Sequence, residues 1–172
     1  MPRVHIGIGS NQQRQHHIRM AVRKLADVFP DLVLSSVYET VAVGFEGDPF
    51  FNLVGGFSTT LSLGPLLDKV RAIEEDCGRV RGEKRYGPRT LDIDVLTYGD
   101  EICEGEPVEI PRSDIVTDAY VLVPLAELSP HSQHPVLGES YAALLNRLRL
   151  DASGVKRIQF DPLSQSPGVV GL

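Results

Sequence analysis

The sequence contains no tryptophan and only two cysteines, Cys77 and Cys103, among its 172 residues. Two cysteines are too few for a disulfide framework, and their spacing matches no zinc motif, so we expect reduced thiols. No apolar run approaches the roughly 20 residues that a membrane-spanning helix needs. The amino terminus shows neither the apolar stretch nor the cleavage site of a secretory signal. These absences together predict a cytoplasmic protein that does not act at a membrane.

An excess of positive charge is also missing, because 17 Lys and Arg stand against 23 Asp and Glu, which gives a net charge of −6. A general nucleic-acid-binding surface is usually basic, so this balance argues against such a role but allows a local basic site for phosphates. The length fits one domain with its own core. We expect this domain to span residues 1–161 and the Ser-, Gly- and Pro-containing residues 162–172 to form a flexible tail.

The pattern of apolar residues predicts the elements of this domain. Alternation over residues 3–10 predicts a strand, and helical spacing from Ile18 to Phe29 predicts a helix that Asn11 caps and Pro30 ends. A second helix is expected from Gly64-Pro65 to Gly78. Further strands are predicted at residues 32–38, 50–61, 90–98 and 155–160, and short helices at 120–128 and 140–148. The order β-α-β-β-α-β predicts an α+β ferredoxin-like sandwich, a mostly antiparallel sheet with helices packed on it.

The most informative stretch is RYGPRTLDIDVL, residues 85–96. Asp92 and Asp94 lie two apart on a predicted strand, so both side chains leave the same face, roughly 6.6 Å apart along the chain. Two adjacent carboxylates repel each other unless a cation compensates them, and Mg²⁺ or Mn²⁺ suits such a pair. The alternative is a pair of solvated carboxylates on an exposed face of the sheet.

A cluster of basic residues precedes the two aspartates. Five of the seventeen cations fall within eleven residues: Arg79, Arg81, Lys84, Arg85 and Arg89. Guanidinium groups bind phosphate oxygens bidentately, while carboxylates hold a bridging metal ion, so the combination favours a site for a phosphate–metal complex. A solvated basic loop is the alternative, and it explains less because the carboxylates follow at once. We expect residues 78–89 to form a mobile loop.

The stretch RYGPRTLDIDVL closely resembles the signature of the 6-hydroxymethyl-7,8-dihydropterin pyrophosphokinase family of folate synthesis. Other segments resemble the family in the same order, among them Gly9-Ser10-Asn11, Pro49 to Asn52 and Gly78-Arg79. The resemblance implies transfer of the terminal diphosphate of ATP to the hydroxymethyl group of the pterin, which leaves AMP. It also implies a monomer whose partners are these two small molecules.

The resemblance further implies roles for particular residues. Asp92 and Asp94 would hold two Mg²⁺ ions, and Arg79 and Arg89 would act with them in catalysis. The pterin would lie between Phe50 and Tyr120, beside Asn52 and the segment Thr40, Val41, Ala42 and Val43. The nucleotide would contact Arg71, Glu74, Arg81, Tyr86, Arg89, Val95 and Arg112, of which Arg81 and Tyr86 belong to the loop that closes over the substrates.

Three positions depart from the family pattern. Arg112 stands where the family commonly has a histidine that contacts ATP phosphates, Tyr86 where it often has tryptophan, and Asp118 where it frequently has arginine. Two alternatives to the enzyme stay open, the first because of these changes and the second because ferredoxin-like folds host many functions. One is a weakly active or non-catalytic paralogue that binds pterin or nucleotide, and the other is an anion- or nucleotide-binding regulatory module. The presence of both Asp92 and Asp94 favours the enzyme, because binding alone hardly needs two metal-binding carboxylates.

Overall fold

A computed structural model of the chain describes residues 1–41, 47–78 and 90–164. The sheet consists of β1 (Arg3–Ser10), β2 (Val33–Leu34), β3 (Val37–Thr40), β4 (Phe50–Ser58), β5 (Asp92–Tyr98) and β6 (Val155–Ile158). The helices are α1 (Arg14–Val28), α2 (Leu63–Asp76), α3 (Ala119–Leu128) and α4 (Tyr141–Leu148), with a short 3₁₀ helix η1 (Ser113–Ile115) before α3. None of the helices in these three described ranges is long and apolar enough to cross a membrane.

The sheet is antiparallel throughout, with the strand order β5-β1-β4-β3-β6 and with β2 paired to β4. The two units β1-α1-β3 and β4-α2-β5 interleave their strands in the order β5-β1-β4-β3. The predicted α+β sandwich with ferredoxin-like topology is therefore confirmed. Among the described residues, β5 is the last strand on its side, so one of its backbone edges pairs with no other described strand.

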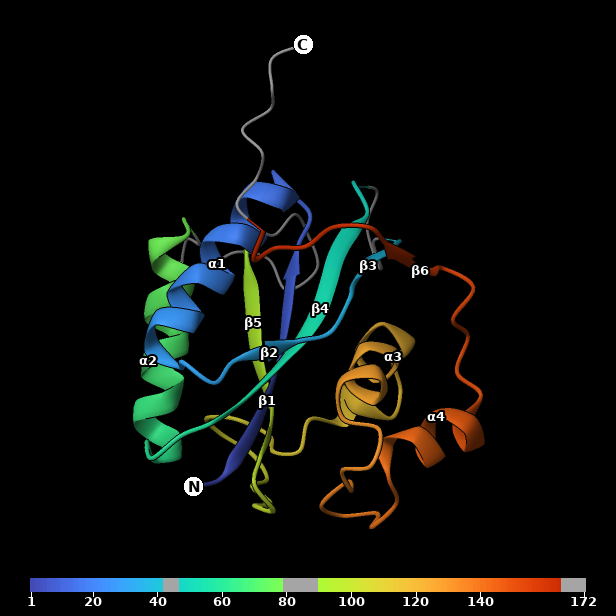
Figure 1. The fold of residues 1–172 in the computed structure, drawn as a ribbon. Helices are drawn as coiled ribbons and strands as arrows, with labels where there is room; N and C mark the ends of the chain where they lie inside the picture. The colour runs from blue at the N-terminus through green and yellow to red at the C-terminus, as the bar shows by residue number, and fades with distance from the viewer. Residues whose placement is uncertain (42–46, 79–89, 165–172) are drawn as a thin grey trace.

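Helices cover both faces of the sheet (Figure 1). On one face α1 and α2 pack against alternate apolar residues of the strands, including Val4, Ile6 and Ile8, which are at most 2% exposed. On the other face α3, flanked by α4, packs against Val54 and Leu96. Successive residues of a strand point to opposite faces, so neighbours on one strand contribute to different cores. That alternation decides which side chains reach the functional site.

Three local expectations are corrected by the structure. The strand predicted at residues 32–38 is divided into β2 and β3, because Ser35 lies between them and uses both its backbone N–H and its hydroxyl to pair with Val54. The strand predicted at 50–61 ends at Ser58. Asn11 does not cap α1, because Gln13 occupies the cap position with φ 44° and the Asn11 amide instead donates to the carbonyl oxygen of Asp48 at 3.2 Å.

The carboxyl-terminal segment returns to α1 after β6. The Phe160 ring lies 5.8 Å from the Phe51 ring, and the Arg19 guanidinium lies 4.7 Å from the Phe160 ring centre. Arg19 also donates to the carbonyl oxygen of Ser164 at 2.6 Å. Residues 149–164 therefore extend the sheet by one strand and cover the apolar edge beside α1.

Candidate functional site

The two aspartates of β5 lie on the face of the sheet that α3 covers. Ile93 and Val95 point the other way and are 4% and 3% exposed in the core beneath α1 and α2, as their alternation predicts. Asp92 and Asp94 are each partly exposed. The strand thus places two carboxylates side by side on one surface and anchors them by burying the residues between and after them.

Two glycines of β1 separate the carboxylates from β4. Gly9 pairs with Asp92 on one side and with Asn52 on the other, while Gly7 pairs with Asp94. A Cβ atom at Gly9 would lie 2.7 Å from Asn52 Oδ1 and 3.8 Å from a ring carbon of Phe50. Glycine at this position therefore lets the side chains of Asn52 and Phe50 extend over β1 toward the aspartates.

The residues expected to bind a pterin gather partly on this same face. Asn52 Nδ2 donates to Thr40 Oγ1 at 2.6 Å, which joins the ends of β4 and β3. Thr40 is 5% exposed, whereas Val41 is 69% exposed. Tyr120 comes from the first turn of α3, and its hydroxyl donates to Asp118 Oδ2 at 3.2 Å.

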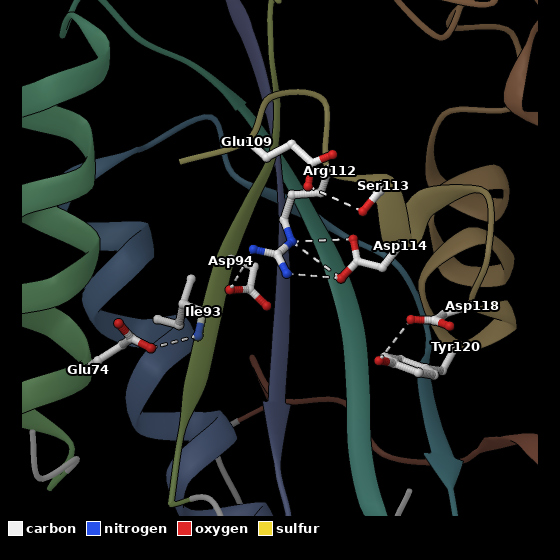
Figure 2. Close-up of polar contacts among 9 residues, drawn as sticks. All are labelled: Glu74, Ile93, Asp94, Glu109, Arg112, Ser113, Asp114, Asp118 and Tyr120. Carbon is white, nitrogen blue, oxygen red and sulfur yellow. Dashed lines mark hydrogen bonds and ion pairs between the residues drawn. The ribbon is translucent and has the colours of Figure 1, made fainter. Parts of the chain in front are cut away.

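Burial and the Asp118 carboxylate raise the pKa of Tyr120, so its hydroxyl stays protonated. Asp118 therefore acts on Tyr120 by accepting this hydrogen bond. The interaction is visible in Figure 2.

Arg112 reaches the carboxylates from the segment before η1 (Figure 2). Its Nη1 lies 3.6 Å from Asp94 Oδ1, and its Nε and Nη2 donate to Asp114 Oδ2 at 3.3 and 3.2 Å. The backbone N–H of Arg112 donates to the carbonyl oxygen of Leu96 at 3.0 Å, which fixes the segment beside β5. Burial and the neighbouring Asp92 raise the pKa of Asp94, and the Arg112 guanidinium opposes that rise.

Those residues expected to contact the nucleotide that the structure describes lie on and beside β5. Glu74 of α2 is 8% exposed, and its Oε2 accepts the backbone N–H of Ile93 at 3.0 Å. Glu74 therefore binds the outer backbone edge of β5, between the two aspartates along the chain. Arg71 lies one turn earlier on α2 and is exposed. The Val95 side chain belongs to the core, on the face opposite the carboxylates.

Several residues of the expected site lie outside the described residues. These are Ala42, Val43, Arg79, Arg81, Tyr86 and Arg89. Their roles remain predictions from the sequence.

Two supporting contacts were not predicted from the sequence. The Tyr38 hydroxyl donates to Glu127 of α3, and the Ser36 N–H donates to the other carboxylate oxygen at 2.7 Å. Tyr38 is also the cross-strand neighbour of Asn52, so this contact fixes α3 relative to the strands that carry Thr40 and Asn52. A lone tyrosine and a glutamate 89 residues apart give no pattern that would reveal such a pair.

Arg14 at the start of α1 makes the second unpredicted contact. It donates to Glu39 Oε2 at 2.9 Å and to the carbonyl oxygen of Pro49 at 3.0 Å, and its guanidinium lies 3.9 Å from the Phe51 ring centre. Arg14 thereby ties the end of β3 to the start of β4, on either side of the segment expected to bind the pterin.

Asp92 and Asp94 supply part of the set of oxygen ligands that a divalent cation requires. No group of three or more His, Cys, Asp or Glu side chains suited to hold a metal ion occurs within residues 1–41, 47–78 and 90–164. Asp92 and Asp94 together supply two carboxylates. Mg²⁺ commonly takes one or two protein carboxylates and completes its shell with water and substrate phosphates, so the pair fits a metal that arrives with a phosphorylated substrate.

The sequence is similar to known proteins over most of its length. The family model for 7,8-dihydro-6-hydroxymethylpterin-pyrophosphokinase (HPPK) matches residues 5–130. The chain belongs to the HPPK family. Among its relatives, the 2-amino-4-hydroxy-6-hydroxymethyldihydropteridine pyrophosphokinase of Aquifex aeolicus is 34% identical over 138 residues, covering 79% of this chain and 86% of that protein. The protein of the same name from Bacillus subtilis is 38% identical over 128 residues, covering 72% and 76%.

Solved structures of HPPK domains share the fold. A Plasmodium falciparum HPPK-DHPS structure with pteroate superimposes with a TM-score of 0.70 at 14% identity, over 91% of this chain and 46% of that one. The chain thus spans less than half the length of that HPPK-DHPS chain. At this identity the match supports the fold of the HPPK-family chain and nothing finer.

Proposed function

We propose that this HPPK-family chain transfers the terminal diphosphate of ATP to the hydroxymethyl group of 6-hydroxymethyl-7,8-dihydropterin and releases AMP. The observation that carries the proposal is the placement of Asp92 and Asp94 on the same sheet face as Asn52, with only Gly9 between Asp92 and Asn52 across the strands. This row of cross-strand neighbours, Asn52, Gly9 and Asp92, brings an amide that can hydrogen-bond the edge of a heterocycle next to a pair of carboxylates. A reaction that joins a heterocycle to a diphosphate needs these two functions side by side.

The pterin is assigned to the β4 side of the row. Asn52 offers amide groups that match the donor and acceptor edge of a pterin, and its contact with Thr40 fixes the orientation of the amide. Phe50 and Tyr120 supply aromatic rings from β4 and α3 for stacking. Val41, Ala42 and Val43 would complete the heterocycle's edge.

The reacting phosphates are assigned to the β5 side. Asp92 and Asp94 would hold two Mg²⁺ ions, which when bound would neutralise the charge on the triphosphate. The carboxylates orient this complex relative to Asn52 because β1 fixes the distance between the strands. Arg112, Arg79 and Arg89 would donate to phosphate oxygens, and Arg89 is the expected donor to the charge that develops during transfer.

The nucleoside is assigned to the outer edge of β5. The Ile93 N–H points outward to Glu74, so the backbone groups of Val95, two residues further along the strand, point to the same side. Val95 would therefore contact the base through its backbone rather than through its buried side chain. Glu74 and Arg71 line this edge from α2, and Arg81 and Tyr86 would cover the bound nucleotide.

The experiment that tests the proposal is a product assay with Mg-ATP and the pterin alcohol that separates AMP from ADP. We expect AMP and pterin diphosphate in equal amounts. Asp94→Asn should reduce turnover by at least about a hundredfold, because it removes a charge that holds the metal. Glu139→Gln is the matched control, since this carboxylate pairs with Arg147 on the surface and should leave turnover unchanged.

Two results would contradict the proposal. Formation of ADP would show transfer of a single phosphoryl group, and wild-type turnover in Asp94→Asn would remove the carboxylates from the mechanism. Absence of any nucleotide product, with pterin binding still measurable by calorimetry, would instead support the non-catalytic paralogue. We further propose that the protein is a cytoplasmic monomer and that residues 1–161 fold as one unit. Cell fractionation would test the localisation, light scattering the monomer, and limited proteolysis the extent of the folded unit.

A further inference from the structure

Arg112 is held in place by one carboxylate and faces another. Its hydrogen bonds go to Asp114, at 3.2 and 3.3 Å, whereas its Nη1 lies 3.6 Å from Asp94 Oδ1, which is an ion pair without a hydrogen bond (Figure 2). Asp114 is the better covered of the two acids, since its side chain is 20% exposed against 38% for Asp94. Asp114 therefore fixes the orientation of the guanidinium, and the Nη1 group of Arg112 is the part of it that lies near Asp94.

This arrangement places a permanent positive charge beside the proposed metal site. An arginine stays protonated at any pH a folded protein tolerates, so the guanidinium cannot be neutralised when a cation binds. A divalent ion on Asp94 would then lie within a few ångströms of Nη1. Two cations at such a distance repel each other by an amount that even a water-like environment does not remove.

A bound triphosphate would change this balance. Its anionic oxygens offer the guanidinium a bidentate partner and at the same time complete the coordination shell of the metal. We infer that Arg112, oriented by Asp114, makes metal binding at Asp92 and Asp94 depend on phosphate, so that the carboxylate pair binds a bare divalent ion poorly and a metal–triphosphate complex well. This inference rests on the proposed function, because it takes the aspartates as the metal site.

The test measures two affinities of the full chain: the affinity for Mn²⁺ without nucleotide, and the affinity for an ATP analogue without metal. Mn²⁺ binding is followed by the loss of its free-ion paramagnetic resonance signal in the absence of nucleotide. Binding of a non-hydrolysable ATP analogue is followed by calorimetry in EDTA. We expect Arg112→Gln to bind Mn²⁺ about tenfold more tightly than the wild type, because the repulsion is gone, and to bind the metal-free analogue at least about fivefold more weakly.

Two further variants separate charge from structure. Arg112→Lys keeps the positive charge and should hold the Mn²⁺ affinity within about threefold of the wild type. Arg147→Gln is the matched control for net charge, because Arg147 is 54% exposed on α4 and bonded to Glu139. It should change neither affinity.

The inference requires that Arg112→Gln strengthen Mn²⁺ binding and weaken binding of the ATP analogue. A residue that only stabilised the segment before η1 would weaken both affinities or neither, so an unchanged or weaker Mn²⁺ affinity in Arg112→Gln overturns the inference. Asp94→Asn shows which assignment has failed. If this variant abolishes Mn²⁺ binding while Arg112→Gln leaves it unchanged, the inference alone is wrong. If Mn²⁺ binding survives in Asp94→Asn, the metal assignment of the proposed function is wrong as well.

Discussion

His5 should make the stability of the protein depend on pH below neutrality. This side chain is 4% exposed on β1, between Thr97 Oγ1 at 2.8 Å from Nδ1 and Ser129 Oγ at 2.9 Å from Nε2. Burial, and to a lesser degree the Arg3 cation, lowers the pKa of His5 from 6.5 to about 4. Both hydroxyl partners can accept a hydrogen bond, so the cost of protonation lies in charging a buried ring rather than in losing these contacts.

The direction follows from proton linkage. Above pH 6.5 the ring is neutral in both states, and its contribution to stability is fully present. Between pH 6.5 and 4 His5 is protonated in the unfolded chain but stays neutral in the folded chain, so the free energy of unfolding falls as the pH falls. The full shift corresponds to about 3 kcal/mol at one pKa unit per 1.36 kcal/mol, of which about 2 kcal/mol is lost between pH 7 and pH 5.

Urea denaturation of the wild type and His5→Gln at pH 7 and pH 5 measures this contribution. Glutamine does not titrate and retains one donor and one acceptor, so the variant should lose about 2 kcal/mol less than the wild type over that interval. Other titrating groups, such as His134, are common to both proteins and cancel in the comparison. Equal losses in the two proteins would contradict a lowered pKa of His5. If His5→Gln does not fold, an NMR titration of wild-type His5 with a pKa near 6.5 would refute it instead.

Three further predictions concern substitutions at single positions. Gly9→Ala should raise the KM for the pterin more than the KM for ATP, because the new Cβ would lie 2.7 Å from Asn52 Oδ1 and displace that side chain; equal changes in both constants would contradict the placement of the pterin. Ser140→Ala should cost about 1 kcal/mol in urea denaturation, since the hydroxyl accepts the Ala143 N–H at the start of α4. Leu25→Ala should cost about 2–5 kcal/mol because the side chain is fully buried, and turnover well below the melting temperature should change little.

Much of the fold followed from local patterns in the sequence. Apolar residues alternate on β1 and β5 and recur at helical spacing in α1 and α2. Both patterns indicate which face of the element is buried, and these buried faces are the ones that pack the helices against the sheet. The prediction of one uninterrupted strand at residues 32–38 was wrong, because a side chain there competes with the backbone. Ser35 interrupts a strand by pairing twice with Val54, and no local pattern distinguishes such a serine from an exposed one.

The burial of His5 illustrates the same limit. On the sequence it occupies the outward-facing position between two apolar residues of β1, which suggests exposure. The structure covers that face with α3, so the imidazole lies in a polar part of the core with partners 92 and 124 residues away. Contacts over such separations depend on which helix covers which face, and alternation within one strand carries no information about that.

The order of the amino acids is enough to show that Asp92 and Asp94 share a face, because side chains on a strand repeat every two residues wherever the strand lies. Which residues lie next to that face depends on how distant parts of the chain pack together. The strand order places Gly9 between Asp92 and Asn52, and the segment before η1 returns to Leu96 and brings Arg112 to Asp94. Local backbone geometry sets the direction in which a side chain points. The contacts that the side chain makes depend instead on how elements far apart in the sequence bury their apolar faces against one another.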